Sequence, residues 1–151
     1  MAILDTTPKA RKEERQVETR PVFECVFLSS SERDLQTVTR LLKSLGIHVH
    51  HAALLEQAEL LLTVTDALVL LSDMKFLDGS WTDAQRTLDR LHPHVALVLA
   101  VEDADEQLWI DVLEQGVYDL VLRPFSADEL RRILQNAHAH AQWNGRAAKS
   151  A

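Results

Sequence analysis

The chain alternates five times between a short apolar run and a longer segment with helical spacing. The apolar runs occupy residues 22–28, 47–51, 67–72, 94–101 and 117–122. After each run, apolar side chains recur three or four residues apart, as they do along the buried face of an α-helix. Strands that alternate with helices are joined by right-handed crossovers and form a parallel sheet covered on both faces. The sequence therefore predicts an α/β fold with a doubly wound, five-stranded parallel sheet.

The strands differ in their expected positions. The runs 22–28, 67–72 and 94–101 are nearly all apolar, as in strands buried on both faces, whereas Ile-His-Val-His-His at 47–51 alternates and fits a sheet edge. Ligands of such sheets bind outside the carboxyl ends of the strands. The residues expected there are Ser29, Ser30, Leu71, Ser72, Asp73, residues 100–103 and Arg123.

The length, charge and composition of the chain limit the number of domains, the kinds of partner and the location that we expect. The 151 residues suit a single domain, expected at 21–141, between a charged and flexible tail at 1–20 and a short C-terminal tail at 142–151. The net charge of -7 argues against a nucleic-acid or membrane-surface partner, since both require a positive face. No apolar run is long enough to span a membrane, and the N-terminus lacks the apolar segment of a signal peptide, so we expect a cytoplasmic location. The single cysteine, Cys25, is expected in the core.

One segment carries a family resemblance. Residues 116–130 read Gly-Val-Tyr-Asp-Leu-Val-Leu-Arg-Pro-Phe-Ser-Ala-Asp-Glu-Leu. This is similar to the pattern Gly-Ala-x-x-x-Leu-x-Lys-Pro-Phe-x-x-x-Glu-Leu of the receiver domains of bacterial two-component response regulators. With Asp78-Gly79 after the third run, the chain resembles that family over residue 22 to about residue 140. The resemblance implies a flavodoxin-like receiver fold with strand order 2-1-3-4-5, and a signalling role in a phosphorelay.

The resemblance also implies a degenerate phosphorylation site. An active receiver has an acidic pair that holds Mg²⁺, a phosphoacceptor aspartate, a hydroxyl residue and a lysine, because phosphoryl transfer requires a metal and a cation to neutralise charge. Here the corresponding positions hold Ser29 and Ser30, then Leu71, then Ala100 or Val101, then Arg123, and the switch aromatic becomes Leu120. We therefore expect no catalytic residue, no metal and no cofactor.

Asp73 is the alternative phosphoacceptor. Side chains two residues apart on a strand point the same way, so Asp73 would face as Leu71 does if the strand ran two residues further. It would still lack an acidic partner, since Ser29 and Ser30 are neutral. Arg123, without a phosphoryl group to meet, is expected to pair with Asp73 or Asp103.

Three functional hypotheses remain. The leading one is a stand-alone receiver-like module that is not an enzyme and acts through protein-protein interaction. The alternative is a phosphorylatable single-domain response regulator that uses Asp73 and Mg²⁺. A small-ligand-binding flavodoxin-like domain is disfavoured, because the strand ends lack a glycine-rich phosphate turn.

The fourth helix suggests where a partner would bind. Its apolar side chains cover more of the circumference than one buried face requires, so some should be exposed. We expect an interface for self-association or a protein partner on the fourth helix, fifth strand and fifth helix, with Trp109, Ile110 and Val121. A core tryptophan beside a scattered surface isoleucine is the other interpretation. The seven histidines are expected at the surface rather than as metal ligands.

Overall fold

The structure is a computed structural model that describes residues 22–103 and 105–150. The charged segment 1–20, expected as a tail, lies outside the described residues. In the part of the chain that is described, no helix is both long and apolar enough to cross a membrane.

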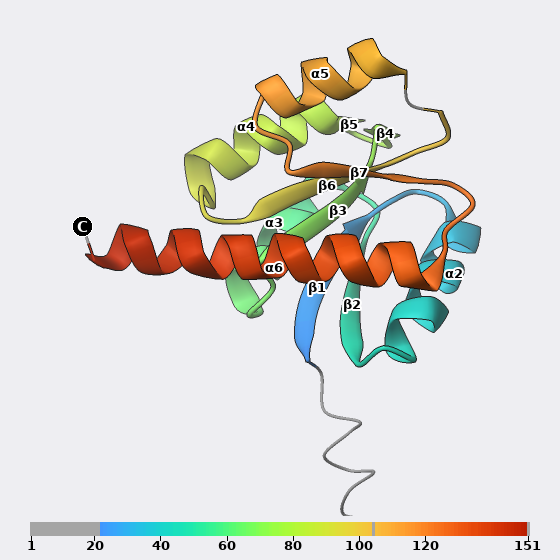
Figure 1. The fold of residues 1–151 in the computed structure, drawn as a ribbon, viewed down its shortest axis with the longest axis horizontal. Helices are drawn as coiled ribbons and strands as arrows, with labels where there is room; N and C mark the ends of the chain where they lie inside the picture. Colours follow the sequence, from blue (N-terminus) through green and yellow to red (C-terminus); the bar gives the residue numbers. More distant parts are fainter. Residues whose placement is uncertain (1–21, 104, 151) are drawn as a thin grey trace, which may run out of the picture.

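A five-stranded parallel sheet forms the centre of the domain (Figure 1). Its strands are β1 (Phe23–Leu28), β2 (Ile47–Ala52), β3 (Val69–Asp73), β6 (Ala96–Val101) and β7 (Asp119–Leu122), in the order β2-β1-β3-β6-β7. This confirms the predicted fold and strand order, with the histidine-rich strand β2 at an edge. A small antiparallel hairpin, β4 (Lys75–Phe76) and β5 (Gly79–Ser80), follows β3 and was not predicted.

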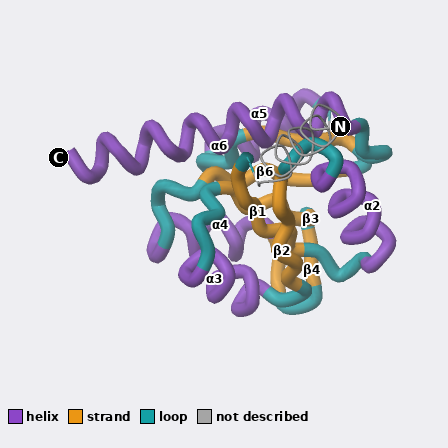
Figure 2. Tube along the Cα trace, turned by 90° about the horizontal axis from the view of Figure 1, so that it is seen from below, coloured by secondary structure: helices purple, strands orange, loops and turns teal. Residues whose placement is uncertain are grey.

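Helices cover both faces of the sheet, as Figure 2 shows from a second direction. One face packs against α2 (Glu32–Lys43) and α6 (Ala127–Ser150), and the other against α3 (Leu55–Val64), α4 (Trp81–Leu91) and α5 (Glu106–Glu114). Residues 142–150, which were assigned to a short tail, continue α6 as helix, and this end of α6 projects past the rest of the domain (Figure 2).

Alternation along the strands divides the core into two layers. On β3, Val69 and Leu71 pack toward α2 and α6, whereas Leu70 packs toward the other three helices. Cys25 is fully buried, as predicted, and burial raises the pKa of its thiol to about 12. Because side chains alternate between the two faces of the sheet, this alternation also determines which residues come together where the strands end.

The helix ends show why the chain turns where it does. Ser31 caps α2 by accepting a hydrogen bond from the backbone N–H of Asp34 (3.2 Å). Beyond α2, Gly46 has a φ of 78°, a left-handed conformation that glycine adopts readily, before the chain enters β2. The start of α3 is capped from the hairpin, because the backbone N–H of Leu55 donates to Oδ1 of Asp78 (2.9 Å).

Candidate functional site

The carboxyl edge of the sheet brings together the strand ends on the α2 and α6 side. Leu28 pairs with Ser72 and Asp73 pairs with Ala100, so Ser29 and Asp73 are neighbours. On the next strand Ala100 pairs with Val121, and Arg123 lies two residues further. Because alternate residues share a face, Ser29, Asp73 and Arg123 all fall on this side of the sheet.

Asp73 is held by hydrogen bonds to both of its carboxylate oxygens. The hydroxyl of Ser29 donates to Oδ2 (2.6 Å), and Nη2 of Arg123 donates to Oδ1 (2.5 Å). Only 14% of the Asp73 side chain is exposed. Ser29 is fully buried and its oxygen also accepts from the backbone N–H of Ser31 (3.1 Å). Asp73 is therefore fixed at the end of its strand by groups of the protein itself.

A second carboxylate, Asp34, completes the cluster. Oδ2 of Asp34 accepts from Nη2 (2.8 Å) and from Nε (3.0 Å) of Arg123. The same Nη2 nitrogen therefore bridges Asp34 and Asp73, which come from the first turn of α2 and the end of β3. We call Ser29, Asp34, Asp73 and Arg123 the carboxyl-edge cluster.

The cluster keeps its guanidinium charged. Burial alone would lower the pKa of Arg123, but the hydrogen bonds from Arg123 to Asp34 and Asp73 outweigh it and raise that pKa above its ordinary value. The guanidinium carbon also lies 5.2 Å from the centre of the Phe125 ring, within the range of a cation–π contact. Arg123 therefore stays positively charged, and its guanidinium is held by Asp34, Asp73 and the Phe125 ring.

Leu71 does not lie at the edge. It is fully buried two residues before the end of β3 and belongs to the same core layer as Ala100. Val101 is also buried, on the opposite face, together with Leu120. Ser30 is exposed, unlike its neighbour Ser29. Of the positions that the resemblance assigned to the site, Ser29 and Arg123 are the ones whose side chains donate hydrogen bonds to the Asp73 carboxylate.

Of two expectations about the site, the one for Asp73 is wrong and the one for Arg123 is confirmed for its Asp73 partner. Asp73 was expected to lack an acidic partner, but Asp34 shares a guanidinium nitrogen with it, because the first turn of α2 passes directly over the strand ends. Arg123 was expected to pair with Asp73 or Asp103. Among the described residues its partners are Asp73 and Asp34, and Asp103 is exposed.

The expected interface needs a correction at one residue. Val121 is fully buried, because it lies on the face of β7 that belongs to the core layer under α2 and α6. The exposed residue of that strand is Leu122, at 39%. On α5, Trp109 (38%), Ile110 (43%) and Leu113 (38%) are exposed and only Val112 is buried. We call Trp109, Ile110 and Leu113 the α5 surface.

The histidines of β2 make local contacts. His50 lies 2.9 Å from Oε1 of Glu24, and this hydrogen bond is the main reason why the pKa of Glu24 is lowered. His51 lies 2.5 Å from the hydroxyl of Thr39. Across residues 22–103 and 105–150, no group of three or more His, Cys, Asp or Glu side chains is arranged to hold a metal ion.

Solved structures resemble this fold closely. The signal receiver domain of a putative LuxO repressor protein from Vibrio parahaemolyticus matches with a TM-score of 0.73 and 16% identity, over 85% of this chain and 97% of that one. The fold is that of a receiver domain. A response regulator receiver domain protein from Clostridium thermocellum matches this receiver fold with a TM-score of 0.72 and 21% identity, over 81% of this chain and 98% of the other.

One characterised protein is also similar in sequence. The C4-dicarboxylate transport transcriptional regulatory protein DctD of Rhizobium meliloti is 26% identical over 113 residues, which is 74% of this chain. The chain spans only 24% of that relative's length. No family model matches the sequence.

Proposed function

We propose that the chain is a receiver-like signalling module that is not phosphorylated and acts by binding another protein or a second copy of itself. In this proposal it is a non-enzymatic part of a two-component system and works in the cytoplasm. Receiver domains transmit signals when a phosphoryl group biases an equilibrium between two surface states. Here the carboxyl-edge cluster would hold the surface in one state.

The observation that carries the proposal is that both oxygens of Asp73 are already bonded. Phosphoryl transfer to a carboxylate requires a free oxygen and a hard cation that neutralises the incoming group. In this chain Ser29 takes one oxygen and Arg123 takes the other, and Arg123 is anchored in turn by Asp34. The guanidinium cannot leave without exposing two neighbouring carboxylates to each other.

One specific observation favours the second candidate, a regulator phosphorylated on Asp73. Asp34 and Asp73 are bonded to the same nitrogen of Arg123, so displacement of that side chain would leave two carboxylates facing one space. Two carboxylates with water are a common ligand set for Mg²⁺. In this candidate Mg²⁺ would compete with Arg123, and Asp73 would become the acceptor.

Incubation with acetyl phosphate and Mg²⁺, followed by intact-mass measurement, separates the two candidates. We expect no gain of a phosphoryl group in the wild type and no change in stability when millimolar Mg²⁺ is added. A mass gain that disappears in Asp73→Asn and persists in Asp103→Asn would replace the first candidate with the second. Arg123→Lys serves as a matched variant, because it keeps the charge but cannot reach both carboxylates with one planar group.

The binding face that we propose is the α5 surface together with Leu122. Large apolar side chains that remain exposed are enriched at protein interfaces. The α5 surface places Trp109, Ile110 and Leu113 on one short helix that has a single buried residue. A fixed carboxyl-edge cluster together with an exposed apolar face is what we expect of a module that is recognised rather than switched.

A further inference from the structure

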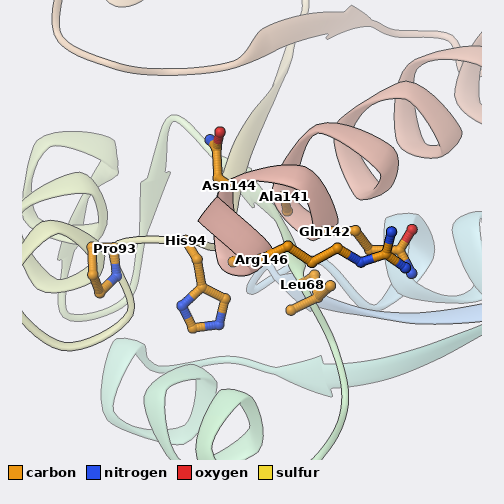
Figure 3. A pocket seen from close by; sticks show the side chains of 8 residues that line it. Leu68, Pro93, His94, Ala141, Gln142, Asn144 and Arg146 are labelled. Atoms are coloured by element: carbon orange, nitrogen blue, oxygen red, sulfur yellow. The ribbon is translucent and has the colours of Figure 1, made fainter. Parts of the chain in front are cut away.

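The opposite edge of the sheet, where the strands begin, holds a cavity that the proposed function does not use. It has a volume of about 630 Å³ and lies under the C-terminal half of α6 (Figure 3). A second cavity of about 750 Å³ adjoins it and shares Leu68, His94 and Gln142. Both volumes fall within the roughly 300–1,000 Å³ of small-molecule sites.

The lining of the first cavity combines an apolar floor with donors of hydrogen bonds. Leu68, Pro93 and the buried Ala141 supply the floor, and His94, Gln142 and Arg146 supply the polar groups. Figure 3 shows His94, Leu68 and Arg146 around the cavity, with Pro93 at one side and Gln142 at the other. Ala141, Gln142 and Gly145 recur at the spacing of one helix face, which α6 turns toward the cavity.

The charge of this cavity is opposite to that of the chain. The net charge is -7, yet the described residues that line this first cavity include an arginine and a histidine and no carboxylate, whereas Glu24 and Asp66 line the adjoining one. In the described part of the chain, Arg146 forms none of the ion pairs. A guanidinium presents five donors in a planar fork that matches a carboxylate. A ligand for this lining therefore has an anionic group and an apolar body.

We propose that this cavity binds a small organic carboxylate, with the carboxylate on Arg146 and the apolar body on Leu68, Pro93 and Ala141. His94 and Gln142 add hydrogen bonds to the ligand. The site is about the length of the strands away from the carboxyl-edge cluster and is independent of whether Asp73 is phosphorylated.

Gly145 allows the cavity to be filled without disturbing the protein. Among the described residues, a Cβ atom placed on Gly145 would meet no atom within 4 Å apart from those of its chain neighbours and of its own helix backbone. Gly145→Leu would therefore extend into open space, and leucine is a better helix former than glycine. The variant should fold at least as well as the wild type and should exclude the ligand.

The test uses benzoate as the probe, with benzamide and benzylamine as its neutral and cationic counterparts, in a two-dimensional NMR titration. We expect saturable shifts for benzoate at His94, Gln142 and Gly145, with at least about tenfold weaker binding of benzamide and benzylamine. Arg146→Gln and Gly145→Leu should each weaken benzoate binding by about tenfold or more, and Arg132→Gln, on the exposed first half of α6, should not.

Any of the following results would overturn the proposal. The first is the absence of saturable shifts at millimolar benzoate. The second is equal binding of benzoate and benzamide, which would mean that Arg146 does not select an anion. The third is equal loss of binding in Arg132→Gln, or shifts centred on the carboxyl-edge cluster, which would mean non-specific attraction or a different site.

Discussion

The two edges of the sheet differ in whether their arginine side chain is paired with carboxylates of the protein. At the carboxyl edge, Arg123 is bonded to two carboxylates and Asp73 has no free oxygen. At the amino edge, Arg146 lines an open cavity without a carboxylate in its described lining. A buried charge is tolerated when partners of the protein satisfy it, whereas a charge that faces a cavity is available to a ligand. The carboxyl edge is therefore closed, since its charged groups bond to one another, whereas the amino edge is open, since its arginine faces a cavity.

The largest effect is expected when a carboxylate is placed at position 71, which lies two residues before Asp73 and inside the core. Leu71 lies on the same face of β3 as Asp73 but is fully buried in the apolar core layer that faces α2 and α6. Leu71→Asp should lower the free energy of unfolding by about 2–4 kcal/mol and should not create a phosphorylation site. Urea melts measure this, and the exposed Leu77→Asp should stay within about 0.5 kcal/mol of wild type. A neutral Leu71→Asp would mean that water reaches that position.

The next largest effect is expected from removing the shared cation of the closed edge. Arg123→Gln leaves Asp34 and Asp73 without their common donor, in surroundings where only 14–23% of these side chains is exposed. The free energy of unfolding should fall by about 2 kcal/mol, compared with less than about 0.5 kcal/mol for Arg33→Gln on the exposed side of α2. Equal effects of the two substitutions in urea melts would show that the bridge adds nothing to stability.

A smaller, pH-dependent effect is expected at the amino edge. His138 stacks on Phe23 with ring centres 4.3 Å apart, and burial lowers its pKa below the ordinary value of 6.5. A histidine with a lowered pKa contributes stability above pH 6.5 that is lost as the pH falls, because the unfolded chain binds the proton more readily. When the pH is lowered from neutral to below 6.5, the free energy of unfolding should fall more for the wild type than for His138→Phe. Parallel stability curves would contradict this assignment.

The smallest effect on stability is expected on the α5 surface, where the readout is association. Trp109→Ala combined with Ile110→Ser removes two exposed side chains and should change the free energy of unfolding by less than about 1 kcal/mol. Sedimentation at increasing concentration should show loss of self-association, or a pull-down should show loss of a partner. The matched variant Trp143→Ala removes another exposed tryptophan, on α6, and should leave both unchanged. A monomer in all cases with the same bound partners would exclude this face.

The fold could be predicted from the sequence because two periodicities determine it. Apolar runs separated by segments of period 3.6 specify parallel strands and crossover helices, and the polar alternation of residues 47–51 identifies the edge strand. The third strand was expected at 67–72 and the family's phosphoacceptor position on Leu71, whereas β3 extends to Asp73 and is followed by the unpredicted hairpin of β4 and β5.

The site was only partly predictable, for a reason that lies in the topology. Asp34 and Arg123 are 89 residues apart, and Asp34 was not among the residues expected at the strand ends. A signal was present, since helices that follow parallel strands begin over the carboxyl edge, where an acid in the first turn can reach a strand end. The position of Val121 was also implied by alternation, because a residue two before Arg123 must share its face.

The hydrogen bond between Asp78 and the start of α3 has a consequence for how the native protein opens. The amide of Leu55 is protected by a side chain 23 residues later in the chain, on the hairpin after β3. Opening of that hairpin therefore exposes this amide even while the rest of α3 stays folded. In hydrogen-exchange measurements the Leu55 amide should exchange together with the hairpin amides rather than with the later turns of its own helix. The first turn of α3 and the hairpin then form one unit of local unfolding that crosses the boundary between two elements.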